Sequence, residues 1–323
     1  MARLSMREAI SQAIWEEMER DSDVVILGEE VGVWGGTYAV TKGFYDHFGP
    51  DRVRDTPIAE GVIVGAANGA AMAGLRPIAE LMTINFAFLA MDQIVNHSAK
   101  LHSMFGGQFK VPIVIRAVGG GGRQLGSTHS QTPDVVFAHF PGLKVVAPGT
   151  PHDAKGLLKA AIRSDDPVMF IENATLYQMK GEVPEEEYTE PIGAAKIQRP
   201  GSDVTIVTYS KMVQASLEAA DRLSKEGIEA EIVDLRTLRP LDMGPAIDSF
   251  KRTNRAVIVE EGWLSFGVGA EVAARLYEQA FDYVDAPIKR VAQKEVPLPY
   301  NQKLEQMALP QVDDIVKAVK GVL

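Results

Sequence analysis

The chain opens with a pattern that is typical of an amphipathic helix. Ser5 and Glu8 have the spacing of a capping box, and apolar residues then recur at every fourth position from Ile10 to Met18. The polar residues at 21–23 interrupt this pattern. The sequence therefore predicts a first helix that begins after Ser5 and ends near residue 20.

Short apolar runs recur along the first 180 residues and alternate with helical patterns. Continuous apolar runs are typical of strands that are covered on both faces of a parallel sheet. One helical pattern is the small-residue stretch from Gly61 to Gly74, and another begins at Pro151 behind the cap residue Thr150. The expected strands lie at 24–27, 77–81, 113–117, 145–147 and 168–171. This alternation predicts an α/β domain with a parallel sheet.

The pattern fails between residues 180 and 202. Three consecutive glutamates, three prolines and Gly201 make this stretch acidic and rich in turn residues, so we expect an inter-domain linker here. A second series of strands and helices follows, with strands expected at 204–208, 229–233 and 256–260 and helices at 211–225 and 267–281. The predicted organisation is thus an α/β domain over 4–179 and a smaller α/β domain over 203–323.

Composition narrows the class of protein. A length of 323 residues suits two domains of about 150 residues each. The formal net charge of -10 argues against a nucleic-acid partner, which would require clustered Lys and Arg. There is no cysteine, which excludes disulfides, thiolate metal sites and a cysteine nucleophile and fits a reducing compartment such as the cytoplasm. No run of about 18 apolar residues occurs, so we expect no signal, anchor or membrane span.

Several familiar catalytic and phosphate-binding signatures are absent. The sequence contains neither G-x-G-x-x-G nor G-x-x-x-x-G-K-[ST], and neither H-E-x-x-H nor G-x-S-x-G. What remains is a set of polar residues near the ends of expected strands, where open parallel sheets place their ligand sites. Glu29 follows the first strand, Glu60 begins the small-residue helix, and His129 follows a run of glycines. Residue type and spacing alone do not name their chemistry.

An ordered set of short motifs resembles one protein family along essentially the whole chain. The run from Asp55 to Glu60, with the segments 65–67 and 74–77, resembles the pyrimidine-binding domain of the beta subunits of 2-oxo acid dehydrogenase complexes, a branch of the transketolase superfamily. Further matching segments lie at 28–31, 92–93, 129–131, 141–146, 153–157, 234–242 and 260–262. The ordered set is far more specific than any single motif in it.

The resemblance implies half of a thiamine-diphosphate site. In this family the beta subunit takes the aminopyrimidine, and an alpha subunit takes magnesium and the diphosphate within an alpha2-beta2 heterotetramer. The magnesium motif of the superfamily begins Gly-Asp-Gly and ends Asn-Asn, and neither Gly-Asp nor Asn-Asn occurs here, as expected for a beta chain.

The implied reaction is oxidative decarboxylation of a 2-oxo acid, with transfer of the acyl group to the lipoyl group of a dihydrolipoyl acyltransferase. Pyruvate is the expected substrate, and a branched-chain 2-oxo acid or acetoin is the alternative that stays open. A single-chain transketolase-type enzyme is disfavoured by the length and the missing magnesium motif. A non-catalytic scaffold is disfavoured because Glu60 and His129 are intact.

The resemblance also implies roles for individual residues. Glu60 is expected to hydrogen-bond a ring nitrogen of the pyrimidine, Glu29 to join an acidic network near the cofactor, and His129 to act on substrate-derived and lipoyl groups. Met82 and Phe86 are expected to pack on the aminopyrimidine, although their spacing is also typical of core residues. Outside this context, a glutamate at a helix start is usually a dipole-compatible acid and a loop histidine is usually solvated.

A potassium site is a further expectation from the resemblance. Ile113, Ala161, Ile162 and Asp166 match positions at which some relatives bind potassium through backbone carbonyls and one side-chain oxygen. Ser164 stands where some of those relatives carry aspartate, so the sequence departs from their pattern at this position.

Overall fold

The computed structural model describes all 323 residues, and they form two compact units. Unit 1 comprises residues 1–119 and 136–192, and unit 2 comprises residues 120–135 and 193–323. Both units contain sheets flanked by helices, which confirms the predicted α/β class. Residues 120–135, which the sequence placed in the first domain, belong to unit 2. The stretch expected as a linker is divided between the units after Ile192.

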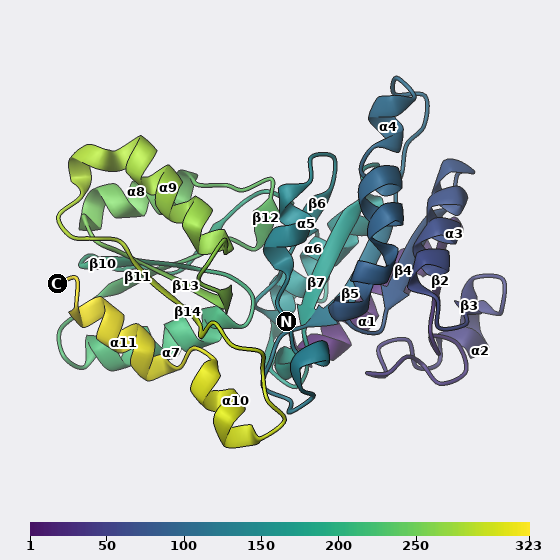
Figure 1. Cartoon of the computed structure of the whole chain (residues 1–323). Helices are drawn as coiled ribbons and strands as arrows, with labels where there is room; N and C mark the ends of the chain where they lie inside the picture. Colours follow the sequence, from purple (N-terminus) through teal and green to yellow (C-terminus); the bar gives the residue numbers. More distant parts are fainter. The chain divides into compact units, whose positions relative to one another are not determined.

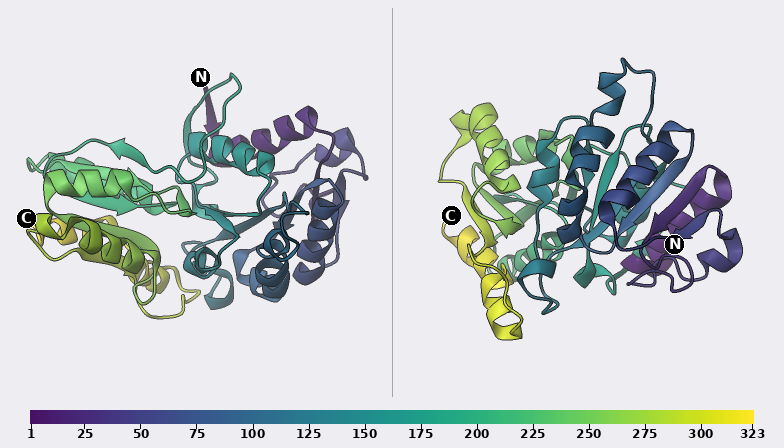
Figure 2. Two further views of the ribbon diagram at one scale, coloured as in Figure 1. Left: turned by 90° about the horizontal axis from the view of Figure 1, so that it is seen from above. Right: turned by 45° about the vertical axis from the view of Figure 1, so that its right-hand side comes forward.

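Unit 1 is built on a parallel sheet whose strands follow the order β6-β7-β5-β4-β2-β3. These strands are β2 (Val24–Gly28), β3 (Val53–Asp55), β4 (Arg76–Leu81), β5 (Val114–Gly119), β6 (Lys144–Val146) and β7 (Val168–Asn173). Most of their side chains are buried because helices cover both faces of the sheet (Figure 2). The five strands expected from apolar runs in this region are all present.

The three long helices of unit 1 begin within one residue of where the sequence predicts. In front of α1 (Met6–Arg20), the hydroxyl of Ser5 accepts from the N–H of Glu8 at 3.3 Å while the Glu8 carboxylate accepts from the N–H of Ser5 at 2.7 Å. Thr150 caps α6 (Pro151–Arg163), which packs against α1. Figure 2 shows these two helices over one face of the sheet and α3 (Glu60–Met72) over the other.

The remaining elements of unit 1 are short. They are α2 (Phe44–Phe48), the 3₁₀-helix η1 (Ile84–Ala90), the π-helix η2 (Asp92–Ser98), α4 (Leu101–Met104), α5 (Asp134–His139), the 3₁₀-helix η4 (Ala174–Leu176) and the antiparallel pair β1 (Ala2–Ser5) and β8 (Lys180–Val183). The first two residues of α5 lie in the part of the chain that belongs to unit 2.

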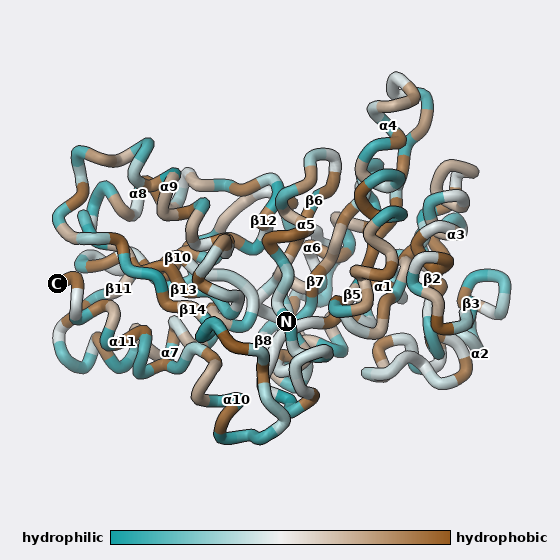
Figure 3. Tube along the Cα trace, viewed as in Figure 1, coloured by the Kyte–Doolittle hydropathy of each residue, from teal (hydrophilic) through white to brown (hydrophobic).

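Unit 2 has a second sheet, with the strand order β14-β13-β10-β11-β9. The strands are β9 (Lys196–Arg199), β10 (Val204–Thr208), β11 (Ala230–Asp234), β13 (Ala256–Trp263) and β14 (Lys289–Gln293), and only β9 is antiparallel to its neighbour. Figure 3 shows β10 and β13 as hydrophobic segments, and their apolar side chains form the core of the unit. The strands expected at 204–208, 229–233 and 256–260 are confirmed.

Helices cover both faces of the second sheet. Figure 1 shows α8 (Gly244–Thr253) and α9 (Val268–Ala280) over one face and α7 (Met212–Ser224) and α11 (Val312–Lys320) over the other. The other elements are η3 (Ser127–His129), β12 (Thr237–Arg239), η5 (Phe281–Tyr283) and α10 (Gln302–Ala308). No helix of the chain combines the length and the apolar character needed to cross a bilayer.

Candidate cofactor site

Two acidic residues lie together at the carboxyl edge of the unit 1 sheet. Glu29 directly follows β2, and Glu60 is the first residue of α3, which comes after the neighbouring strand β3. A hydrogen bond of 2.9 Å from the N–H of Thr56 to the carbonyl of Gly28 joins the segment between β3 and α3 to the end of β2. Both acids are buried, with exposed fractions of 6% for Glu29 and 4% for Glu60.

The pair Glu29 and Glu60 is electrostatically unfavourable without a ligand. Burial raises the pKa of Glu29, and the negative charges of Glu60 and Glu30 raise it further. The Oε1 atom of Glu29 and the hydroxyl of Thr56 are buried without a hydrogen-bond partner. An unsatisfied buried polar group costs about 1–3 kcal/mol, so such groups gather where a ligand completes the hydrogen bonding. These oxygens therefore fit a polar heterocycle that carries N–H donors.

Two apolar residues follow the neighbouring strand β4 at the same edge of the sheet. Met82 follows β4, the other neighbour of β2, and Phe86 lies within η1. Both side chains are half-buried. The helix α3 approaches η1 closely, since a Cβ atom on Gly61 would lie 3.4 Å from the carbonyl oxygen of Leu89. The structure therefore brings the predicted acidic residues and the predicted apolar residues to one edge of unit 1.

A buried charged row holds these strands in register. Glu80 on β4 pairs in register with Arg116 on β5, and Glu172 on β7 lies diagonally, two residues beyond Phe170, the register partner of Arg116. The Arg116 guanidinium donates to both carboxylates. Glu80 also pairs in register with Gly28, where a Cβ atom would lie only 2.5 Å from the Glu80 carbonyl oxygen. Removing one partner of a buried ion pair costs about 3–5 kcal/mol. The row thus fixes the strand ends that carry Glu29 and Met82.

His129 lies in η3, in the part of the chain that belongs to unit 2. Its side chain is exposed, and its Nδ1 atom lies 3.0 Å from the Thr128 hydroxyl in a hydrogen bond. The segment around it is closed by the N–H of Gly120, which donates to the carbonyl of Gln131 at 3.1 Å. The four residues predicted to bind the cofactor therefore belong to unit 1, and His129, predicted as catalytic, belongs to unit 2.

Sequence reasoning assigned no role to two buried glutamates that contact the segment carrying His129. Glu261 on β13 accepts the N–H of Gly121, and Glu305 on α10 accepts the N–H groups of Gly122 and Gln124. Glu261 could have been noticed, because it belongs to the matching segment 260–262 at a strand end. Glu305 lies in a short helix without any motif, and no local signal distinguishes it.

A cluster of buried acids lies in the same unit. The side chain of Asp134 is buried, and its Oδ1 atom has no hydrogen-bond partner. Burial raises the pKa of Asp134 to about 7, and the negative charges of Glu261 and Glu260 contribute. Burial likewise raises the pKa of Glu260 to about 7, although the N–H of Gly269 donates to its carboxylate. Protons are therefore retained in this cluster well above the usual range for carboxyl groups.

The cluster makes the stability of the chain depend on pH. The folded chain keeps the Asp134 proton up to about pH 7, whereas an unfolded chain releases it near the ordinary value of 3.8. Stability is therefore lost as the pH rises from about 4 to about 7. We expect Asp134→Asn to remove this contribution, so that the variant gains about 3 kcal/mol relative to wild type between pH 5 and pH 8. Urea unfolding followed by circular dichroism checks this, and parallel pH dependences would contradict it.

The oxygens matched to a potassium site contact protein groups instead. The guanidinium of Arg76 donates to the carbonyls of Ile162 (3.2 Å) and Ser164 (3.1 Å). The ammonium of Lys144 lies 2.9 Å from the Asp166 carboxylate and donates to the Ser164 hydroxyl at 3.0 Å. The other two matched carbonyls accept backbone N–H groups: Ile113 from Val168 (2.9 Å) and Ala161 from Ser164 (3.1 Å). Two cationic side chains therefore already contact oxygens of this set, which makes a further cation there unfavourable.

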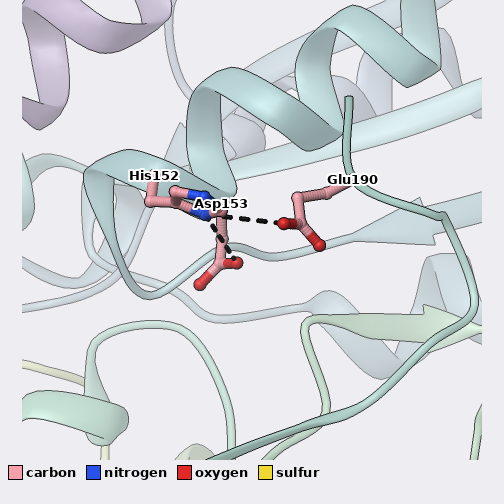
Figure 4. A group of neighbouring side chains, drawn as sticks. All are labelled: His152, Asp153 and Glu190. Atoms are coloured by element: carbon pink, nitrogen blue, oxygen red, sulfur yellow. Dashed lines mark ion pairs between the residues drawn. The ribbon is translucent and has the colours of Figure 1, made fainter. Parts of the chain in front are cut away.

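A separate group of titratable side chains lies at the start of α6. Figure 4 shows His152 between Asp153 and Glu190, with its Nδ1 atom 3.5 Å from the Asp153 carboxylate and 3.6 Å from the Glu190 carboxylate. The imidazole also stacks on Tyr188, whose hydroxyl donates to the His152 carbonyl at 2.9 Å. These contacts fasten residues 188–190 to α6, and we assign the group a structural role.

Comparison with known proteins extends these observations. The transketolase pyrimidine binding domain matches residues 2–180, and the transketolase C-terminal domain matches residues 193–315. A solved structure described as "Split gene transketolase, inactive beta4 tetramer" has a TM-score of 0.81 and 25% identity, over 99% of this chain and 98% of that chain. The two matched domains place the chain among the transketolase-type, thiamine-diphosphate-dependent enzymes.

Relatives narrow the class further. The "Pyruvate dehydrogenase E1 component subunit beta" of Rickettsia felis is 51% identical over 99% of this chain and 98% of its own length. The mitochondrial subunit beta-2 of that component from Oryza sativa subsp. japonica is 50% identical over 98% of this chain and 85% of its own length. The chain belongs to the family of pyruvate dehydrogenase E1 component beta subunits. This confirms the predicted resemblance and favours the pyruvate dehydrogenase function over the branched-chain and acetoin alternatives.

Proposed function

We propose that this chain supplies the pyrimidine-binding half of a thiamine-diphosphate site and works in an alpha2-beta2 heterotetramer. The observation that carries the proposal is the buried pair Glu29 and Glu60, with an unpartnered carboxyl oxygen, at the carboxyl edge of the unit 1 sheet. The Gly-Asp-Gly to Asn-Asn motif is missing, so magnesium and the diphosphate are assigned to the alpha subunit. When bound, thiamine diphosphate supplies the electron sink for decarboxylation.

The chain's own residues hold and orient the heterocycle in this proposal. The Glu60 carboxyl group holds or shares a proton with a ring nitrogen, and its burial keeps water from competing for that hydrogen bond. Glu29, whose pKa is raised by burial and by the charges of Glu60 and Glu30, continues the hydrogen bonding at this edge. Met82 and Phe86 provide the apolar wall for a flat ring. His129 donates a hydrogen bond or a proton to the substrate-derived group and to the incoming lipoyl group.

The substrate and partners follow from the same proposal. We assign pyruvate as the 2-oxo acid and the lipoyl group of a dihydrolipoyl acyltransferase as the acyl acceptor, supported by the names of the relatives. Potassium is given no role, because Arg76 and Lys144 already contact the matched oxygens. A cytoplasmic location is proposed from the cysteine-free composition alone.

The substrate assignment is tested with the chain reconstituted with its alpha subunit. We expect kcat/KM for pyruvate to exceed that for a branched-chain 2-oxo acid or acetoin by about 10-fold or more, because added methylene groups are discriminated by about 10–200-fold in a fitted pocket. The measurement is acylation of the lipoyl group with each substrate at equal enzyme concentration, because acetoin has no carboxyl group to release as carbon dioxide. A higher kcat/KM for a branched substrate would show that the pocket was built for a larger acyl group.

A further inference from the structure

The residues 120–131, here named the histidine loop, adopt a backbone that needs outside support. Gly120, Gly122 and Gly126 have φ values of 86°, 104° and 78°, and Gln124 has a φ of 56° although it is not a glycine. Left-handed backbone is unfavourable for residues with a side chain and persists where the surroundings hold it. Within the loop backbone, hydrogen bonds join Gly120 to Gln131 and Gly126 to His129.

Glu305 provides one part of that support. Its side chain is fully buried, with an exposed fraction of 0%, on α10. Its carboxylate accepts the N–H of Gly122 at 3.0 Å, the N–H of Gln124 at 3.1 Å and the side-chain amide of Gln124 at 3.2 Å. A carboxylate only accepts hydrogen bonds, and bonds to a charged acceptor are stronger than those between neutral groups. Glu305 therefore gathers three donors from the strained part of the loop.

Glu261 provides a second part, one residue earlier in the loop. Its carboxylate accepts the N–H of Gly121 at 2.6 Å and lies 3.3 Å from the ammonium of Lys211. The same ammonium donates to the carbonyl of Gly121 at 3.1 Å. The peptide groups on both sides of Gly121 are thus held by the ion pair of the buried Glu261 and the partly buried Lys211.

Close packing leaves the histidine loop little freedom to shift. A Cβ atom on Gly121 would lie 2.5 Å from a methyl carbon of Leu298, and one on Gly126 would lie 2.4 Å from the ring of Tyr300. The bare backbone of the loop therefore rests on the segment 298–309, which also carries Glu305. Gly126 immediately precedes η3, so this packing reaches the turn that contains His129.

We propose that Glu261 and Glu305 form a clasp that positions His129 for its part in the reaction. The proposal rests on the role given to His129 above and names the residues through which unit 2 fulfils that role. Both glutamates are positioning residues, since neither is required to touch substrate or cofactor. The alternative is that Glu261 and Glu305 only stabilise the fold. Their replacement would then lower the stability of the chain, and the loss of rate would be the same with and without His129.

The first test is Glu305→Gln in the complex reconstituted with the alpha subunit and the acyltransferase. Glutamine keeps the size and one acceptor oxygen, but its amide N–H groups face the N–H donors of the loop. We expect the overall rate to fall about 10-fold or more while the melting temperature changes little. The matched control is Glu231→Gln. Glu231 is another buried acid of unit 2, and its carboxylate pairs with Arg252, which lies outside the histidine loop. Its rate should stay within about twofold of wild type.

The decisive test is a double-mutant cycle with His129→Ala. If the clasp acts through His129, adding Glu305→Gln to His129→Ala should change the residual rate by less than about twofold. Fully additive losses would overturn the clasp while leaving the role of His129 intact. An undiminished rate for His129→Ala alone would overturn that role, and the purpose of the clasp with it.

A second variant covers the case in which Glu305→Gln does not fold. Lys211→Met removes the ammonium that contacts Gly121 and leaves the Glu305 contacts in place. We expect a smaller loss of rate that also disappears in the His129→Ala background. A loss of the same size in both backgrounds would contradict the proposal.

Discussion

Glu60→Gln is expected to lower turnover by about two to four powers of ten, which corresponds to roughly 3–5 kcal/mol in the barrier. Glutamine keeps the size and much of the polarity of Glu60, but it cannot exchange a proton with a ring nitrogen. The fold and the heterotetramer should persist. Proton exchange at the thiazolium carbon of the cofactor, followed by NMR in deuterated buffer, should slow in parallel with turnover.

A control variant separates this role from that of any acid at a helix start. Glu271 stands in the first turn of α9, is exposed, and pairs with Arg275 one turn later. Glu271→Gln removes a charge that is compatible with the helix dipole, which is worth about 0.3–1 kcal/mol, and should leave turnover unchanged. If Glu60→Gln also kept turnover and the rate of thiazolium proton exchange within a few-fold of wild type, Glu60 would act only as an acid at a helix N-terminus.

His129→Ala is expected to lower overall activity about 100-fold or more while cofactor affinity changes little. The reason is its place on the histidine loop, apart in sequence from the acidic pair that is assigned to the pyrimidine. Steady-state kinetics and a cofactor titration of the reconstituted enzyme measure the two quantities separately. A collapse of cofactor affinity with an unchanged rate at saturation would make His129 a binding or structural residue.

His47→Ala is the matched control for that variant. His47 is also an exposed histidine, and it lies on α2, where its imidazole contacts the Glu19 carboxylate at 2.5 Å and stacks near Trp15. No part of the proposed reaction involves this residue. Its replacement should change both activity and cofactor affinity by less than about twofold.

Local sequence pattern predicted the buried part of the fold well. The central strands of both sheets are covered on both faces, so their sequences are continuous apolar runs that can be recognised along the chain. The same reasoning missed β8 and β9 inside the stretch expected as a linker. β8 pairs only with β1, and β9 stands at an edge of its sheet, so both are polar and only partly buried. Edge strands of this kind lack the signal on which the prediction depended.

Long-range contacts explain what could not be predicted about domain organisation. The assignment of residues 120–135 to unit 2 depends on contacts such as that between Gly122 and Glu305, which are 183 positions apart in the sequence. Hydrophobic periodicity is a local property and contains no information on such pairs. The domain division expected from the sequence, with a boundary near residue 180, therefore did not assign residues 120–135 to the second domain.

The positions of the candidate site residues and their chemistry were predicted on different grounds. The rule that ligands lie at the carboxyl ends of parallel strands pointed to Glu29 and Glu60, which in the structure follow β2 and begin α3. Their chemistry came from the family resemblance and stays a proposal until the variants are measured. The potassium expectation was transferred from motif positions alone, and a motif does not show that Arg76 and Lys144 contact the same oxygens.

The central claim is that this chain supplies only half of an active site. The most direct measurement is pyruvate decarboxylation with thiamine diphosphate and magnesium, by the purified chain alone and after mixing with its alpha subunit. The account predicts no turnover above background for the chain alone and full activity at an equimolar ratio. Sustained cofactor-dependent turnover by the chain alone would contradict it.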